Sequence, residues 1–227
     1  MTRQSVGEET LQHSLVEVGS GNQRQERLDA FAANRMLYPY AQQAQFLIEE
    51  GALPEQIDRV IYEFGFPMGP FGLGDLAGLD VGWRVRQHRE PTRPKDLRYS
   101  PIADRLYEMG RYGQKTNRGW FRYEEGSRTP IPDPEVAELI VRTSEELGIE
   151  RREISDEEIL QRCMYPLINM GARVLEEGIS ERSSDLDLVW LYGYGFPRYR
   201  GGPMFYADSV GVDHVYETMK RFHEVHT

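Results

Sequence analysis

The side chains that most often carry acid–base or metal chemistry are sparse in this sequence. It has one cysteine, Cys163, and five histidines, which are His13, His88, His214, His223 and His226. His223 and His226 are three residues apart and could share a metal ion, but exposed histidines without a ligand are the simpler interpretation. Cys163 is expected in the core. A single cysteine excludes an internal disulfide and favours a reducing, intracellular compartment.

Two glycine patterns resemble nucleotide-binding loops but lack the required context. Gly72, Gly74 and Gly78 have the wrong spacing for the dinucleotide fingerprint, and no strand precedes them. Residues 16–21 contain a short strand-like lead, but the third glycine is missing and no βαβ unit surrounds them. We therefore expect no NAD binding and no metal site in this chain by itself.

Composition narrows the class of protein. The chain has 227 residues, of which 39% are hydrophobic and 28% charged, as in a soluble globular protein. No apolar run approaches the ~20 residues that a membrane-spanning helix needs. The formal net charge is −10, and the densest basic stretch, residues 84–98, is interleaved with acids and prolines, so we interpret it as a solvated surface loop. Nucleic-acid binding and a membrane span are not expected.

An internal repeat is the most informative feature of the sequence. Residues 34–51 read NRMLYPYAQQAQFLIEEG, and residues 161–178 read QRCMYPLINMGARVLEEG. The match continues in the same order through Ile57-Asp58 with Leu186-Asp187, Gly65-Phe66-Pro67 with Gly195-Phe196-Pro197, Gly69-Pro70 with Gly202-Pro203, and Asp75, Gly78 and Asp80 with Asp208, Gly211 and Asp213. This order predicts two tandem units of related structure.

Helical signals dominate both copies. Ser155 begins a capping box, apolar residues then recur at helical spacing, and Gly178 is a helix stop. Pro39 and Pro166 lie inside the repeated helices and should kink them. Further helices are expected over residues 54–65, 100–110 and 134–147, with few strand candidates. The aromatic residues Trp120, Phe121 and Tyr123 belong to a short, partly extended link that should pack on the first copy. The expected fold class is all-α.

Several collinear motifs resemble the C-terminal region of the 3-hydroxyacyl-CoA dehydrogenase family. They are residues 34–40 (NRMLYPY), 63–71 (EFGFPMGPF), 75–83 (DLAGLDVGW), 110–115 (GRYGQK) with 119–120 (GW), 192–197 (YGYGFP) and 201–206 (GGPMFY). The tandem copies are similar to multifunctional enzymes of fatty-acid β-oxidation. In those enzymes the resemblance implies an enoyl-CoA hydratase/isomerase module, a Rossmann domain and then two helical domains.

The resemblance implies a fold and a domain plan. The fold would be two tandem helical domains of the type also found at the C-terminus of 6-phosphogluconate dehydrogenase. Residues 28–126 would form the first domain, residues 127–154 a linker with one helix, and residues 155–227 the second domain. Residues 1–27 would be a tail that remains from the link to an NAD-binding domain. One departure is Ala30-Phe31, where the family usually has Gly-Phe.

The resemblance also implies a reaction, the oxidation of 3-hydroxyacyl-CoA to 3-oxoacyl-CoA with NAD. The family's catalytic His-Glu pair and an assisting Ser come from the Rossmann domain, and an assisting Asn comes from the helical half. That position matches Asn34, whose amide would donate to the substrate oxygen or orient the catalytic His. Without the motif, Asn34 would be interpreted as a helix cap or a packing residue. Gln161 replaces it in the second copy, which suggests that this copy is structural.

The loop that follows the second helix of the first copy is the other candidate site. Pro67, Met68, Gly69, Pro70 and Phe71 resemble the stretch that borders the acyl-chain pocket. Met adapts well to irregular apolar shapes, which suits a variable alkyl tail. The alternative is an ordinary turn whose apolar residues fill the core, and the sequence does not decide between the two.

Two hypotheses of function follow. In the first, the chain is the acyl-CoA-binding helical part of an NAD-dependent dehydrogenase, inactive by itself and dependent on a separate Rossmann domain. In the second, it is a non-catalytic helical module that docks other β-oxidation subunits. A cytoplasmic location is expected, or a peroxisomal one in a eukaryote.

Overall fold

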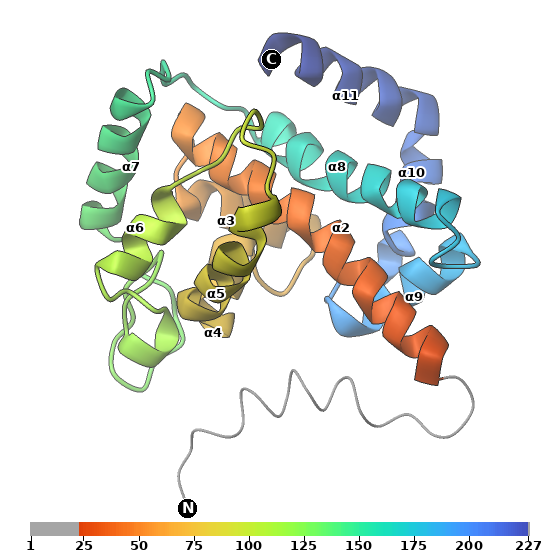
Figure 1. The fold of residues 1–227 in the computed structure, drawn as a ribbon, viewed down its shortest axis with the longest axis horizontal. Helices are drawn as coiled ribbons and strands as arrows, with labels where there is room; N and C mark the ends of the chain where they lie inside the picture. Colours follow the sequence, from red (N-terminus) through yellow and green to blue (C-terminus); the bar gives the residue numbers. More distant parts are fainter. Residues whose placement is uncertain (1–22, 227) are drawn as a thin grey trace, which may run out of the picture. The chain divides into compact units, whose positions relative to one another are not determined.

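The computed structural model describes residues 23–226, which form ten α-helices and no extended strand (Figure 1). The helices are α2 (Gln23–Glu50), α3 (Pro54–Phe64), α4 (Pro70–Ala77), α5 (Leu79–Arg89), α6 (Ile102–Glu108), α7 (Pro134–Glu146), α8 (Asp156–Glu176), α9 (Ser183–Gly193), α10 (Pro203–Val210) and α11 (Val212–His226). Short 3₁₀ turns lie at η1 (Glu90–Thr92), η2 (Gln114–Thr116) and η3 (Arg198–Arg200). The predicted all-α class is confirmed.

Local sequence signals set most helix boundaries. Helices α3, α6 and α7 begin and end within two residues of the predicted limits. Ser155 caps α8 as expected, because its Oγ accepts from the Glu158 amide at 3.2 Å. Helix α2 begins earlier than the sequence suggested, inside the stretch interpreted as a tail, and continues through Pro39, as α8 continues through Pro166. The kinks expected at these prolines stay predictions.

The described chain forms two compact units whose limits differ from those of the repeats. The central unit holds residues 41–160, and the C-terminal unit holds residues 23–40 together with residues 161–226. The limits fall inside α2 and α8. Each long helix therefore contributes its N-terminal part to the unit that contains the other copy's shorter helices. The domain boundaries expected from sequence stay a prediction.

Glycine packing shows how the first copy's long helix enters the C-terminal unit. A methyl group placed on Gly171 of α8 would lie 2.6 Å from the Met204 Sδ of α10 and 2.9 Å from the Met36 Cε of α2. The missing side chain at Gly171 thus allows three helices to pack closely, and two of them come from the second copy. Trp190 and Leu186 of α9 are among the buried residues of this unit.

In the central unit, arginines compensate an unfavourable helix end. Helix α2 ends with Glu49 and Glu50, and acidic side chains at a helix C-terminus are destabilising. Arg98 pairs with Glu49 at 2.8 Å and with Glu50 at 2.6 Å. Arg151 donates to the carbonyl oxygens of Ile48 at 2.5 Å and Gly51 at 3.1 Å, which satisfies backbone acceptors that the helix leaves open.

The repeat has a specific structural meaning at the start of α4 and of α10. The Asp58 carboxylate accepts from the amides of Phe71 at 3.0 Å and Gly72 at 2.7 Å. The Asp187 carboxylate accepts in the same way from the amides of Met204 at 2.7 Å and Phe205 at 3.2 Å. In both copies an aspartate from the preceding helix therefore binds the free amides of the next helix start.

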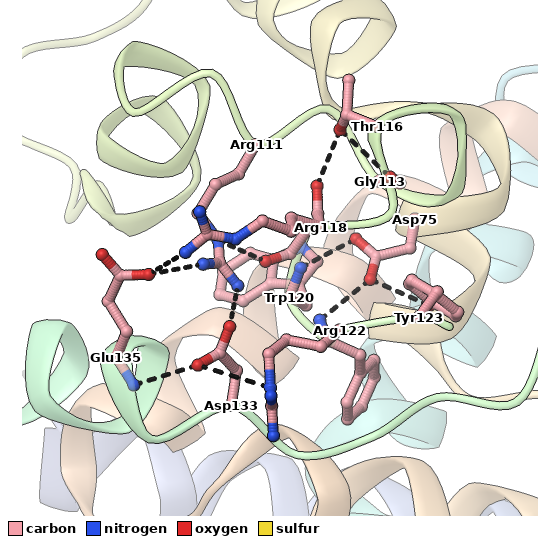
Figure 2. A network of polar contacts seen from close by, with 12 residues as sticks. Asp75, Arg111, Gly113, Thr116, Arg118, Trp120, Arg122, Tyr123, Asp133 and Glu135 are labelled. Atoms are coloured by element: carbon pink, nitrogen blue, oxygen red, sulfur yellow. Dashed lines mark hydrogen bonds and ion pairs between the residues drawn. The ribbon is translucent and has the colours of Figure 1, made fainter. Parts of the chain in front are cut away.

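The link after the first copy is built around two buried acids, Asp75 and Asp133 (Figure 2). Asp75 accepts from the amides of Trp120 at 2.8 Å and Phe121 at 3.0 Å, and from the Tyr123 hydroxyl at 2.9 Å. Isolated bridges join parts of the link, whose aromatic residues are buried. The predicted partly extended link that packs on the first copy is confirmed.

A buried arginine holds the other side of this link. Arg111 binds Asp133 at 2.6 Å and the Gly119 carbonyl oxygen at 2.9 Å, as Figure 2 shows. Burial raises the pKa of Asp133, but the hydrogen bond and the charge of Arg111 outweigh it, so the pKa lies below its usual value. The pair is thus charged at neutral pH and connects the link to the start of α7.

The basic stretch over residues 84–98 differs from the prediction. It was expected to be a solvated loop, but its first part belongs to α5 and several of its cations are paired. Arg86 binds Asp104 at 2.7 Å, and Arg93 binds Glu90 at 2.8 Å.

Within residues 23–226, every helix is too short or too polar to cross a bilayer.

Candidate functional site

Asn34 presents an exposed amide on α2, in the C-terminal unit. The Tyr194 hydroxyl donates to its Oδ1 at 3.0 Å, from the segment that follows α9. Across the described residues, the Asn34 Nδ2 donates no hydrogen bond. The oxygen of this amide accepts from Tyr194, and its two N–H groups remain available to an external acceptor.

An ion pair anchors the residue next to Asn34. Arg35 binds both carboxylate oxygens of Glu177, at 2.5 Å and 3.0 Å, and contacts the Met170 Sδ at 3.8 Å. The hydrogen bond from Arg35 lowers the pKa of Glu177. Burial raises the pKa of Tyr194, so its hydroxyl stays protonated and able to donate. The Arg-x-x-Tyr-Pro motif of the first copy is thus bound, next to Asn34, by the Glu-Glu-Gly motif of the second copy.

The matching position in the second copy has a different environment. Gln161 is only 9% exposed, whereas Asn34 is open to solvent. A buried amide cannot meet a substrate unless the structure changes. The two equivalent positions therefore differ in their access to an external ligand.

The second candidate, the loop between α3 and α4 in the central unit, divides into two parts. Phe71 is 2% exposed, and its ring lies 4.6 Å from that of Trp120, so it belongs to the core. A methyl group at Gly69 would overlap the Asp58 backbone and carboxylate. Pro67 is exposed and Met68 and Pro70 are partly exposed. Pro67, Met68 and Pro70 are therefore the members of this loop whose side chains could contact a ligand. Asn34 belongs to the other unit.

The described residues do not fit a bound dinucleotide. Gly72 and Gly74 lie inside α4, a helix of eight residues that follows another helix rather than a strand. A dinucleotide loop needs a strand–turn–helix unit, and none occurs within residues 23–226. The other glycine pattern, residues 16–21, lies outside the described residues.

Metal and cavity candidates are also few. No group of three or more His, Cys, Asp or Glu side chains in the described part of the chain could hold a metal ion. Cys163 is buried, as predicted, and His88, His214 and His223 are exposed. An open hollow of about 550 Å³ is lined by Arg105, Glu108, Met109, Leu139, Arg142 and Glu146. None of these residues is a predicted site residue.

A family comparison decides the membership of the chain. Residues 31–123 and 159–227, which together are more than half of it, match the 3-hydroxyacyl-CoA dehydrogenase C-terminal domain. The chain belongs to the 3-hydroxyacyl-CoA dehydrogenase family. The two matched stretches correspond to the two copies of the repeat. Enzymes of this family generally use NAD.

Relatives of this dehydrogenase family chain include large peroxisomal proteins. This chain is 48% identical over 205 residues to the peroxisomal bifunctional enzyme of Homo sapiens, and the match covers 85% of this chain and 28% of that protein. The peroxisomal bifunctional enzyme of Danio rerio is 46% identical over 205 residues, covering 85% of this chain and 29% of that protein. The chain therefore spans less than a third of the length of these relatives.

Solved structures agree with the dehydrogenase family assignment. The dehydrogenase part of multifunctional enzyme 1 from C. elegans has a TM-score of 0.62 and 33% identity, over 74% of this chain and 37% of that one. The 3-hydroxybutyryl-CoA dehydrogenase of Escherichia coli has a TM-score of 0.61 at 20% identity, over 82% of this chain and 54% of that one, and it supports the fold alone.

The sequence predicted a role for Asn34 but gave no indication of its hydrogen-bond partner, Tyr194. Tyr194 lies in the repeated block that matches Glu63–Pro67, where the first copy has Phe64. The added hydroxyl at this position was the available signal. Its partner is 160 residues away in the chain, so no local pattern could have identified the contact.

Proposed function

We propose that this chain is the helical, acyl-CoA-facing part of an NAD-dependent 3-hydroxyacyl-CoA dehydrogenase of fatty-acid β-oxidation. The observation that carries the proposal is the exposed Asn34 amide, whose oxygen accepts from Tyr194 and whose nitrogen is available to donate. The family membership and the relatives' names support the reaction class.

Asn34 would act through its N–H groups. A donor to the substrate oxygen would stabilise negative charge that develops as the hydroxyl becomes a carbonyl. A donor to the catalytic His would instead fix the orientation of the base. Either role acts on the transition state more than on substrate binding, so it should affect kcat.

NAD, in this proposal, is bound by a separate Rossmann domain that also supplies the catalytic His-Glu pair. The described residues do not fit the dinucleotide, so no step of hydride transfer is assigned to them. The relatives' names support an additional catalytic module, which we propose to be an enoyl-CoA hydratase/isomerase. Their peroxisomal names favour a peroxisomal location over the cytoplasmic one.

The loop after α3 would contact the acyl chain. Pro67 is exposed and Met68 is partly exposed, so these two would face the ligand. Gly69, Pro70 and Phe71 would support them, because they form the start of α4 and Phe71 packs on Trp120. In this arrangement both interpretations of the loop hold, each for a different part. Phe71 fills the core, and Pro67 and Met68 face the ligand.

The proposal is tested by combining the chain with an NAD-binding domain from a relative, as a fusion or a mixture. NADH formation from 3-hydroxyacyl-CoA should require both parts. Asn34→Ala should lower kcat about 100-fold or more, the usual loss when one donor to developing charge is removed. Thermal melting should change little, because Asn34 is exposed.

Gln161→Ala is the internal control and should leave kcat within about twofold where the fold is retained. Equal slowing by the two substitutions, or an effect of Asn34→Ala only through unfolding, would contradict the proposal. It would favour the alternative of a non-catalytic assembly module. Family-typical turnover by the chain alone would overturn the assignment of NAD to another domain.

A further inference from the structure

Tyr194 and Asn34 bring the second copy of the repeat into contact with the candidate catalytic group of the first. The hydroxyl of Tyr194 lies 3.0 Å from the Asn34 Oδ1, and both residues belong to the C-terminal unit. The contact is a side-chain hydrogen bond from a residue that the proposed chemistry does not yet use. It acts on the one group that we assign to the reaction.

The ring of Tyr194 is held in place by its surroundings. It lies 4.8 Å from the ring of Trp190, which is 1% exposed. The Tyr194 amide donates to the Trp190 carbonyl oxygen at 3.3 Å, and the Phe196 amide donates to the same oxygen at 3.0 Å. Gly195, at φ 73°, permits the tight turn between them. The hydroxyl is therefore presented from an ordered segment.

The residue next to Asn34 on α2 is also bound. Arg35, adjacent to Asn34, is bound through two hydrogen bonds to Glu177, just beyond the end of α8. Helix α2 is thus tied down at Asn34 by Tyr194 and at Arg35 by Glu177. Rotation of the Asn34 amide is the freedom that remains, and the hydrogen bond from Tyr194 selects one of its two orientations.

We propose that Tyr194 is a positioning residue for Asn34. By donating to Oδ1 it directs the N–H groups of the amide toward the reacting oxygen or the catalytic His. The second copy then contributes to turnover instead of serving only as scaffold. The first copy has no equivalent, since Phe64 carries no hydroxyl and Gln161 replaces the asparagine. This inference rests on the proposed role of Asn34.

The contact can be observed without turnover in the full chain. There are only four asparagines, Asn22, Asn34, Asn117 and Asn169, so labelling with ¹⁵N-asparagine gives four side-chain NH₂ pairs. Tyr194→Phe should move the Asn34 pair and leave the Asn117 and Asn169 pairs unchanged. Tyr192→Phe is the matched control, because Tyr192 is 73% exposed and lies two residues earlier. An unmoved Asn34 pair in Tyr194→Phe overturns the inference.

Turnover is measured in the enzyme formed with an NAD-binding domain. Tyr194→Phe should lower kcat about fivefold at unchanged KM, the effect of losing one neutral hydrogen bond, while Tyr192→Phe leaves kcat unchanged. In an Asn34→Ala background, Tyr194→Phe should have no further effect. Asn34→Asp keeps an acceptor for Tyr194 but has no N–H, so it should be as slow as Asn34→Ala.

The outcomes separate the two proposals. Normal turnover by Asn34→Ala would refute the catalytic assignment of Asn34, whatever happens at position 194. Slow turnover by Asn34→Ala with normal turnover by Tyr194→Phe would refute only the positioning role. Additive losses in the double variant would also refute it, because Tyr194 would then act independently. Thermal melts of each variant exclude unfolding, and phenylalanine fits this position in the first copy.

Discussion

Asp75 is 1% exposed, whereas its counterpart Asp208 in the second copy faces solvent. The two residues occupy equivalent places in helices α4 and α10, which start in the same way from Asp58 and Asp187. Asp75 accepts three hydrogen bonds from the link around Trp120, and no hydrogen bond to the Asp208 carboxylate is found among the described residues. The difference therefore comes from a segment outside the repeated sequence.

This comparison separates what the repeat specifies from what its surroundings add. The aspartate that binds the helix start and the glycine beside it are common to both copies. The next aspartate is Asp75 in the first copy and Asp208 in the second. It becomes buried and hydrogen-bonded only where another segment of the chain covers it, as the segment around Trp120 covers Asp75. In the same way, Asn34 is exposed and Gln161 is buried, although both occupy the first position of the motif. Equivalent positions in a repeat can thus have different roles.

Replacing Asp75 is the strongest test of the comparison. Asp75→Ala leaves the amides of Trp120 and Phe121 and the Tyr123 hydroxyl without their acceptor, so we expect a loss of about 3 kcal/mol or more in the free energy of unfolding. Asp208→Ala should stay within about 0.5 kcal/mol. Urea unfolding followed by tryptophan fluorescence measures both. Similar losses in the two variants would show that the copies do not differ in this way.

The shared glycine gives the next largest effect. A methyl group at Gly69 or Gly202 would overlap the aspartate that binds the helix start, so each substitution to alanine should cost about 2 kcal/mol. Gly202→Ala should cost about 1 kcal/mol more, because Gly202 has φ 104° and Gly69 has φ −82°. Gly193→Ala, with open space around it, is the control. A tolerated change in either copy would break the proposed equivalence of the helix starts.

The smallest expected effect is a dependence of stability on pH. Burial raises the pKa of Asp58 to about 7 and that of Asp75 to about 6, from an ordinary value of 3.8. A carboxyl whose pKa is raised in the folded state stabilises the fold fully below its unfolded pKa, and this contribution is lost as pH rises through the folded pKa. Stability of the central unit should therefore fall from about pH 4 to about pH 7, by on the order of 1 kcal/mol per pH unit for each group.

Substitution of these groups isolates their titration. Asp58→Asn and Asp75→Asn should each flatten the pH profile of melting in the central unit. Burial also raises the pKa of Asp187, so the stability of the C-terminal unit should depend on pH with the same sign. Stability that rises between about pH 4 and about pH 7, or a slope that both variants leave unchanged, would contradict this assignment.

The class of fold, the repeat and the family could be predicted from the amino-acid sequence. Helix boundaries were readable because proline, capping serine and glycine act within one turn of the chain. Pro54 and Ser155 mark helix starts, and Gly65 marks a helix end. The repeat was readable because two copies in one chain show which positions are constrained. The block that begins at Asn34 was assigned by its resemblance to the family motif. The family match, whose first stretch covers residues 31–123, confirms that resemblance.

Contacts between residues far apart in the chain could not be predicted from the sequence. Tyr194 and Asn34 are 160 residues apart, and Asp75 and Trp120 are 45 apart, so their contacts depend on how separate helices pack. Packing also decided that Phe71 is core while Pro67 is exposed, although both belong to one short apolar loop. Local propensity determines where a helix begins. Whether a given side chain is buried depends on which distant segment packs against it.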